Sequence, residues 1–335
     1  MRTFFSKYTP LIFCTILLLS LPACKNPSDK ISKSDFYFDT IITVTLYDAA
    51  KESLLNDCFS IADTYEHYFS ATRPDSDVSK INQSGGVPVE VHGETAELIE
   101  KGLYYSELSG GGFDITVGNL TSLWDFTGEN PKVPEDAEIQ NAIASVDYRN
   151  VEVSGNTVTL KNPDARIDLG GIAKGYIADK MKEYLVEQGV TEGIINLGGN
   201  VLCLGEKSGE PYRIGVQKPF DAEGTPLFAL DITDQTVVTS GVYERYFTME
   251  DTLYHHILNP KTGYPYDNHL LSVTIICGKS LDADALSTTC FSLGLDKGME
   301  LIETLADTEA VFITDDNELH FSGGIGEKIP FRALE

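Results

Sequence analysis

Basic residues are scarce in this sequence of 335 residues. It has 25 lysines and arginines against 51 aspartates and glutamates, which gives a formal net charge of −26 at pH 7. Such an acidic surface argues against binding to nucleic acid and against attraction to anionic lipid headgroups. It does not exclude an anionic nucleotide, because a metal ion or a lysine can reverse the field inside a cleft.

Several familiar motifs are also missing. The chain shows no G-x-x-x-x-G-K-[S/T] phosphate loop, no G-x-G-x-x-G fingerprint and no H-E-x-x-H zinc motif. Its cysteines follow neither C-x-x-C nor zinc spacing. Four of them, Cys58, Cys203, Cys277 and Cys290, lie in apolar segments, so we expect buried free thiols in preference to disulfides.

The N-terminal apolar run, Leu11–Leu21, is too short to span a bilayer, which takes about 20 residues. It follows two basic residues and ends in Leu-Pro-Ala-Cys24, which resembles a bacterial lipobox. We expect residues 1–23 to be a lipoprotein signal peptide, Cys24 to be acylated, and residues 24–34 to be a polar tether. The protein would then be extracytoplasmic and attached to a bacterial membrane through its lipid anchor only. An ordinary signal peptide with a chance cysteine is the alternative.

The remaining segment, 35–335, predicts an α+β fold with mixed sheets and packed helices, either as a single large domain or as two intertwined lobes. Helical spacing of apolar residues and β-rich runs are interspersed without strict βαβ alternation. We expect helices over 53–69, 95–108, 173–188 and 282–293. We expect strands that include 36–47, 151–160 as a hairpin, 166–169, 194–197, 256–258 and 272–277, and a polar loop over 130–138.

One candidate site follows Asp168, where an expected strand runs into Gly170-Gly171 and then into a helix that begins near Ala173. Glycines allow a bulky ligand to approach the backbone, and free N–H groups at a helix N-terminus attract phosphate. Lys174 would add a positive charge in the first turn. The alternative is an ordinary strand–turn–helix corner.

A second candidate pairs Asp284 with Thr288, four residues apart on an expected helix and therefore on one face of it. A carboxylate and a hydroxyl suit a hard cation such as Mg²⁺ and leave room for phosphate oxygens. The alternative is that Asp282 or Asp284 caps the helix.

Two further stretches carry polar or glycine-rich patterns. The paired histidines His255 and His256 precede a turn at Asn-Pro, and could act as a base or bind a metal; exposed strand-end histidines are the alternative. Gly110-Gly-Gly112, followed by Phe113 and Asp114, could hold a planar ring against the backbone, or could be a loop packed on a core tryptophan.

In their order along the chain, these motifs resemble the ApbE family of FAD:protein FMN transferases. The resemblance rests on Phe-Asp-Ile-Thr-Val-Gly, Ile-Asp-Leu-Gly-Gly-Ile-Ala-Lys-Gly-Tyr, Asn-Leu-Gly-Gly-Asn, Thr-Ser-Gly-Val-Tyr, His-His-Ile-Leu-Asn-Pro-Lys-Thr-Gly and Ala-Asp-Ala-Leu-Ser-Thr. It extends from about Asp39 to about Phe321. The family implies an extracytoplasmic enzyme that takes FAD as substrate with Mg²⁺, attaches FMN through a phosphoester to a Thr or Ser of flavin-carrying redox proteins, and releases AMP.

The resemblance also implies roles for individual residues. Asp284, Thr288 and the backbone carbonyl of Gly171 would be metal ligands, and His256 would lie at the reaction site as the base for the acceptor hydroxyl. An unperturbed histidine would lose that function below a pH of about 6.5. Contacts to FAD would come from Phe38, Thr72, Gly112, Phe113, Asp114, Asp168, Lys174 and Leu258.

The chain departs from the family at two of these positions. It has Phe38-Asp39-Thr40 where the family often has Met-Gly-Thr, and Thr72 where a tyrosine is thought to lie on the flavin ring. Loss of that ring would weaken flavin stacking by about 1 kcal/mol. Two alternatives to the transferase follow: an FAD pyrophosphatase that uses water as nucleophile, and a flavin-binding lipoprotein without chemistry.

Overall fold

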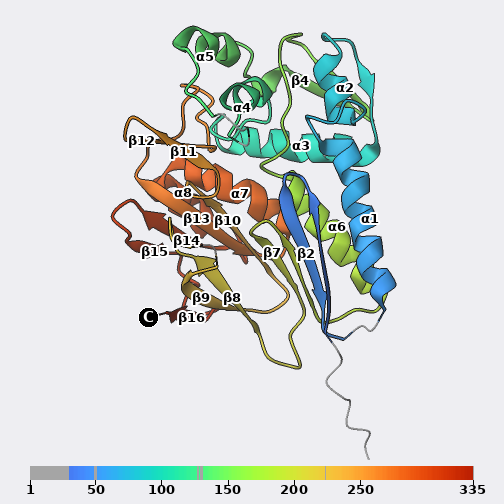
Figure 1. Cartoon of the computed structure of the whole chain (residues 1–335), viewed down its shortest axis with the longest axis vertical. Helices are drawn as coiled ribbons and strands as arrows, with labels where there is room; N and C mark the ends of the chain where they lie inside the picture. Colours follow the sequence, from blue (N-terminus) through green and yellow to red (C-terminus); the bar gives the residue numbers. More distant parts are fainter. Residues whose placement is uncertain (1–29, 49–50, 127, 129–130, 223, 335) are drawn as a thin grey trace, which may run out of the picture.

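The computed structural model describes residues 30–48, 51–126, 128, 131–222 and 224–334. The expected signal peptide and Cys24 lie outside these ranges. No helix within them is long and apolar enough to cross a membrane. The fold is α+β, as predicted, and its centre is an antiparallel eight-stranded sheet (Figure 1). In spatial order its strands are β1 (Ile31–Tyr37), β2 (Thr40–Leu46), β6 (Gly193–Leu197), β7 (Asn200–Leu204), β10 (Thr236–Gly241), β13 (Leu270–Cys277), β14 (Glu309–Thr314) and β15 (Leu319–Phe321).

Both faces of this sheet are covered, because its central strands are apolar on both sides. Alternation along β13 sends Ile275 toward the helices and Ile276 toward a second sheet. The helices are α1 (Glu52–Phe69), α6 (Ala173–Glu187), α7 (Ser280–Leu293) and α8 (Leu295–Thr304). The second sheet has three strands in the order β16 (Phe331–Ala333), β9 (Pro226–Ile232) and β8 (Tyr212–Gln217).

Shorter elements gather at one end of the large sheet (Figure 1). Trp124 is fully buried there among apolar side chains and donates a hydrogen bond from Nε1 to the Gly263 carbonyl at 2.7 Å, so it is a core residue. The elements are α2 (Asp77–Gln83), α3 (Gly93–Leu108), α4 (Gly118–Trp124), α5 (Asp136–Ile143), the 3₁₀ helix η1 (Tyr148–Asn150), the sheet of β3 (Val89–Glu90), β5 (Thr157–Leu160) and β4 (Val151–Ser154), and the hairpin of β11 (Tyr246–Met249) and β12 (Thr252–His255).

Helices α6 and α7 cap each other. Asp179 of α6 accepts hydrogen bonds from the first two N–H groups of α7, those of Ser280 and Leu281, at 2.9 and 3.0 Å. In return, Asp284 of α7 accepts from the N–H of Gly175 in the first turn of α6 at 2.8 Å. Neither helix has a capping side chain of its own. The two carboxylates therefore satisfy donors that would otherwise be unpaired and fix where the α6 N-terminus lies.

Gly175 is the point of closest approach between these helices. A Cβ there would lie 2.2 Å from the Ser280 carbonyl oxygen and 2.7 Å from the Leu281 Cα, both backbone atoms that cannot rotate away. Only glycine therefore allows the α6–α7 contact that places Asp284 beside the start of α6.

We expect Gly175→Ala to lower the free energy of unfolding by roughly 1–3 kcal/mol through overpacking. Helix propensity alone would raise the free energy of unfolding instead, since alanine is favoured over glycine in a helix by about 1 kcal/mol. Urea denaturation measures the difference. Gly278→Ala is the matched control, because its Cβ would meet nothing within 4 Å. A Gly175→Ala protein as stable as the control would contradict this account of the helix contact.

The N-terminal part of the domain differs from expectation. Residues up to 34 were predicted to be a tether, but β1 begins at Ile31 and pairs along its whole length with β2. The single strand predicted over 36–47 is wrong: it is interrupted by a two-residue turn in which Phe38 and Asp39 have φ of 53° and 54°. Such turns usually carry glycine, asparagine or aspartate, and because Phe38 is none of these the pair gave little warning of the hairpin.

Several other predicted elements differ from the structure. The strand expected over 166–169 is reduced to one bridge, between Val117 and Arg166. The strand expected over 256–258 is not formed as predicted, because β12 ends at His255. The expected loop over 130–138 includes the start of α5, whose Glu135 and Glu138 form a capping box. Helices α2, α4 and α8 were not predicted; two of them have only seven residues, too few for a clear periodic pattern. The four cysteines of the domain are buried free thiols, as predicted.

Candidate functional site

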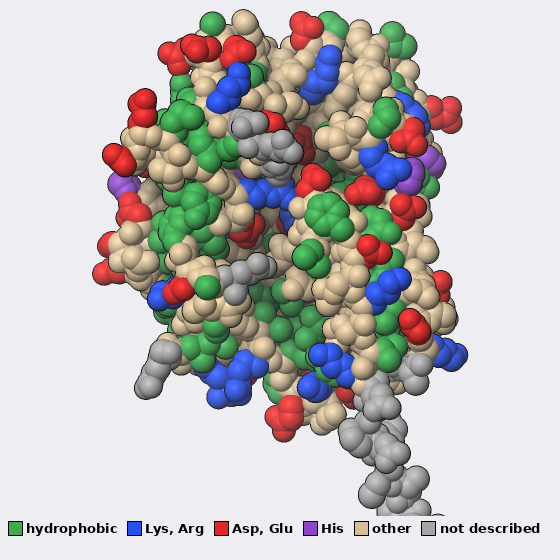
Figure 2. Space-filling view, viewed as in Figure 1, with side chains coloured by type: hydrophobic (Ala, Val, Ile, Leu, Met, Phe, Trp, Pro, Cys, Tyr) green, Lys and Arg blue, Asp and Glu red, His purple; other side chains and the backbone are tan. Residues whose placement is uncertain are grey.

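A cavity of about 1130 Å³ opens on the face of the molecule seen in Figure 2, which is hollowed near its centre with basic side chains inside. Pockets for small molecules are usually roughly 300–1,000 Å³, so this one is large enough for an extended ligand. It brings together every site residue predicted within the domain: Phe38, Thr72, Gly112, Phe113, Asp114, Asp168, Gly171, Lys174, His256, Leu258, Asp284 and Thr288. Their individual roles remain predictions.

The wall at the start of α6 has the features of a phosphate site. Asp168 accepts from the Gly170 N–H at 2.8 Å and from the Thr121 hydroxyl at 2.7 Å, which fixes the turn before the helix. Gly171 lies against Phe113, whose Cε2 atom would be 3.0 Å from a Cβ at that position. The helix then begins at Ala173, and Lys174 in its first turn lines the cavity. The dipole of α6 and the charge of Lys174 both favour binding of an anion at the N-terminus of this helix.

Asp284 and Thr288 are one turn apart on α7 and both line the cavity. Asp284 is 5% exposed, and burial raises the pKa of its carboxyl group, while the Lys174 charge and the Gly175 N–H lower it. The Thr288 hydroxyl lies 3.1 Å from the Ser240 hydroxyl, which also bonds Ser287 at 2.7 Å. The sequence analysis gave helix capping as the alternative role of Asp284. Asp284 does cap a helix, but that helix is α6 and not α7, which carries it.

The two histidines have different surroundings. His255 is 4% exposed, with Nε2 at 2.9 Å from the Tyr266 carbonyl and Nδ1 accepting from the Ile257 N–H, so both ring nitrogens are engaged and the residue is structural. His256 lines the cavity, and its Nδ1–H donates to the Arg245 carbonyl at 3.3 Å. This assignment leaves Nε2 of His256 as a hydrogen-bond acceptor.

Desolvation, with the charges of Arg245, His255 and Lys174, lowers the pKa of His256 to about 3. The side chain is therefore neutral above a pH of about 3, and its Nε2 is unprotonated throughout the neutral range. The unperturbed imidazole assumed in the expected loss of function below a pH of about 6.5 does not match these surroundings, and the pH dependence of transfer stays a prediction.

Glu244 is a cavity residue that the sequence analysis missed. Its side chain is exposed to the water of the cavity, and desolvation by the protein atoms around it raises its pKa to about 7 against the lowering effect of Lys174 and Arg245. Unlike His256, it is therefore a group in the cavity that can exchange a proton near neutral pH. It follows directly on the Thr-Ser-Gly-Val-Tyr motif, which was the only available clue.

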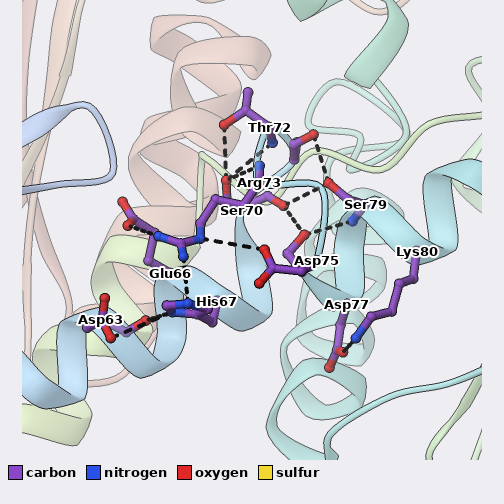
Figure 3. Close-up of polar contacts among 12 residues, drawn as sticks. Asp63, Glu66, His67, Ser70, Thr72, Arg73, Asp75, Asp77, Ser79 and Lys80 are labelled. Carbon is purple, nitrogen blue, oxygen red and sulfur yellow. Dashed lines mark hydrogen bonds and ion pairs between the residues drawn. The ribbon is translucent and has the colours of Figure 1, made fainter.

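The loop that carries Thr72 also carries a cation, Arg73, that sequence reasoning assigned only to a turn (Figure 3). The Ser70 hydroxyl accepts from the N–H groups of Thr72 and Arg73 at 3.2 and 3.1 Å. The guanidinium donates to Glu66 at 3.2 Å and to Nε2 of His67, whose Nδ1–H bonds the Asp63 carbonyl. Arg73 lines the cavity and supplies positive charge beside Thr72.

The Gly112–Asp114 segment has a strong structural role. Asp114 is 7% exposed and accepts from the N–H and hydroxyl of Thr116 and from the N–H of Tyr148, at 2.8, 2.6 and 3.0 Å. Burial raises its pKa, and these hydrogen bonds lower it. Its carboxylate oxygens thus hold the loop that presents Gly112 and Phe113 to the cavity.

A polar and an aromatic feature complete the walls. Asn200 is 1% exposed; its Oδ1 accepts from Ser280 at 2.7 Å, and its Nδ2 has no hydrogen-bond partner among the described residues. Such a donor suits an oxygen-rich ligand. Phe220, held at φ 58°, lies 5.5 Å from Tyr246 and 6.0 Å from Tyr243, ring centre to ring centre, and all three line the cavity.

Known proteins share this architecture and sequence. The family model described as ApbE family matches residues 38–312. A relative from Treponema pallidum, named FAD:protein FMN transferase, is 32% identical over 89% of this chain and 88% of its own. One of the same name from Klebsiella pneumoniae is 38% identical over 81% of this chain and 85% of its own.

Solved structures agree with the sequence comparison. The ApbE protein of Thermotoga maritima superimposes with a TM-score of 0.81 at 34% identity, covering 88% of this chain and 97% of that one. The flavin transferase ApbE of Vibrio cholerae gives 0.79 at 27% identity, with 89% and 98% covered.

An antiparallel α+β core with one large cavity of acidic, basic and hydroxyl side chains thus defines an enzyme of the flavin transferase class. The chain belongs to the ApbE family.

Proposed function

We propose that the protein transfers FMN from FAD to a Thr or Ser hydroxyl of flavin-carrying redox proteins and releases AMP. The observation that carries this proposal is that the residues matched to the family, although scattered from Phe38 to Thr288, meet in one cavity. The cavity combines an anion site at the start of α6 with side chains able to exchange a proton. Relatives that carry the name FAD:protein FMN transferase support the same chemistry.

Mg²⁺ fits the donors that the cavity presents. Among the described residues no group of three or more His, Cys, Asp or Glu side chains could hold a metal ion. A site built from the Asp284 carboxylate, the Thr288 hydroxyl and the Gly171 carbonyl has oxygen ligands only and leaves positions for water and phosphate, as Mg²⁺ prefers. When bound there, Mg²⁺ would neutralise charge on the diphosphate.

The chain's own residues would account for the remaining chemistry. A bond forms between the acceptor oxygen and the phosphorus of the FMN half, and the bond from that phosphorus to the oxygen of AMP breaks. Lys174 and the α6 N-terminus hold phosphate oxygens, and the Nδ1–H···O bond to Arg245 directs the free Nε2 of His256 to the hydroxyl proton. AMP leaves with the bridging oxygen.

A pyrophosphatase is the second candidate, favoured by one observation. Thr72 places a small hydroxyl side chain on the cavity wall where the family often has a ring, so less of the cavity is closed to water. FAD, Mg²⁺ and a purified flavin-carrier domain distinguish the candidates. FMN attached to the carrier in step with AMP supports transfer, AMP with free FMN indicates hydrolysis, and bound FAD without AMP indicates a binding protein.

We further propose that the protein is a lipoprotein of the extracytoplasmic side. Support comes from the Leu-Pro-Ala-Cys24 sequence after a short apolar run. Removal of residues 1–23, which include two basic and no acidic side chains, would take the formal charge from −26 to −28.

Cys24→Ala is expected to give an unprocessed or soluble product, because the thiol is the point of lipid attachment. Fractionation of membranes and mass spectrometry of the mature N-terminus measure this. Cys58→Ala, at a buried thiol of the domain, controls for the loss of a cysteine. A wild-type protein whose mature chain starts at another residue would rule out the lipoprotein.

A further inference from the structure

An exposed apolar pair lies at the tip of the β1–β2 hairpin. Among the described residues, the three most exposed large hydrophobic side chains are Ile41 at 64%, Phe36 at 63% and Val87 at 63%. Phe36 and Ile41 are direct cross-strand partners, so they form one patch. Single exposed apolar residues are ordinary on a protein surface, but a paired patch of this exposure suggests a contact.

The patch departs from the pattern of its own strands. Further along the same face the paired positions are hydroxyl residues: Ser34 bonds Thr43 at 2.8 Å, and Ser32 bonds Thr45, which is buried, at 2.9 Å. This face of the hairpin is thus polar for most of its length and becomes apolar only at the turn. Packing within the domain does not require the change, since both side chains remain exposed.

The patch adjoins residues that line the cavity. The turn that joins the two strands, Phe38-Asp39-Thr40, lines the cavity. The neighbouring β6–β7 turn lines it too, and its Gly198 donates its N–H to the Ile41 carbonyl at 3.3 Å. Phe36 and Ile41 do not line the cavity themselves, but along the chain they lie within two residues of side chains that do.

We propose that the Phe36–Ile41 pair is the docking point for the polypeptide that accepts FMN. The inference rests on the proposed function, because a polypeptide hydroxyl must reach the cavity while the rest of its chain stays outside. An apolar contact at the rim holds that chain beside the opening, and β1 is the edge strand of the described sheet, open to an extended segment. A contact between the patch and the membrane is less suited. The proposed lipid anchor at Cys24 precedes β1, and the chain enters β1 at Ile31, at the far end of the hairpin from its turn (Figure 1).

The test is the double variant Phe36→Ser with Ile41→Thr, which continues the existing row of serine and threonine pairs. Transfer of FMN to a purified carrier domain with one acceptor threonine is measured against carrier concentration. We expect KM for the carrier to rise about tenfold or more. We expect kcat at saturating carrier, and the Kd for FAD measured by flavin fluorescence, to stay within about twofold.

Val87→Ser, at a position of equal exposure away from the cavity, is the matched control and should leave KM unchanged. A double variant with the wild-type KM overturns the proposal. This holds even if light scattering shows that the variant has lost a dimer, which would make the patch a contact between two copies of this chain. A wild-type enzyme that modifies no carrier is a different failure, which removes the proposed function itself.

Discussion

Asp284→Ala is expected to lower Mg²⁺-dependent release of AMP from FAD by roughly 10³-fold. The carboxylate is the one charged side chain in the proposed metal site, so its loss removes most of the attraction for the cation. Thr288→Ala should cost less, because water can replace a neutral hydroxyl. Initial rates across a range of Mg²⁺ concentrations measure both effects.

The structural role of Asp284 has to be separated from this result. The carboxylate accepts from the Gly175 N–H, so the alanine variant also loses a cap of α6, at a cost of about 1 kcal/mol in stability. Asp284→Asn keeps an oxygen acceptor for that N–H and removes only the charge. Asp282→Asn, two residues earlier and bonded to the Tyr105 hydroxyl at 2.7 Å, is the matched control. Near-normal turnover of Asp284→Asn would refute the metal assignment and leave capping as its function.

His256→Ala is expected to retain FAD binding and to lose FMN transfer by roughly 10²–10⁴-fold, since a base acts on the proton only in the transition state. Rates are corrected for the folded fraction with thermal melts in the presence and absence of FAD. His269→Ala is the control: this exposed histidine bonds Asp315 at 2.8 Å and does not line the cavity. A corrected rate close to that of the wild type would remove His256 from the mechanism.

The pH dependence of transfer distinguishes His256 from Glu244. Because the pKa of His256 is lowered to about 3, its neutral form persists as the pH falls, and a mechanism based on it gives a flat rate from pH 8 to pH 6. The pKa of Glu244 is raised to about 7, so its basic form is lost as the pH falls through 7, and the rate would fall with it. A fall near pH 7 that disappears in Glu244→Gln would assign the proton to Glu244.

The candidate site could be assembled from sequence because its residues follow local rules. Lys174 comes just after a glycine pair at a helix start, and Asp284 and Thr288 share a helix face, so spacing alone suggested an anion site and a metal site. Resemblance to a family then joined motifs that lie far apart in the chain. The cavity confirms that they meet.

What the sequence could not supply depends on tertiary contact. Neither Glu244 nor Arg73 belongs to a recognisable motif. Their importance appears only in the folded protein, where Glu244 lines the cavity and Arg73 contacts Glu66 and His67. The low pKa of His256 likewise arises from burial near Arg245 and Lys174, which one-dimensional spacing does not reveal. The Phe38-Asp39 turn was missed because phenylalanine is not typical of a left-handed conformation, and Asp39 alone is a weak signal.

The most direct test of the central proposal is the mass of an acceptor domain after incubation with the enzyme, FAD and Mg²⁺. The account predicts that the acceptor gains one FMN unit at a single Thr or Ser, that AMP appears in equal amount, and that the band fluoresces as a flavin in a denaturing gel. Replacement of that Thr or Ser by alanine should abolish the gain. An acceptor of unchanged mass, with AMP and free FMN accumulating in the same mixture, would contradict the transferase and establish a pyrophosphatase.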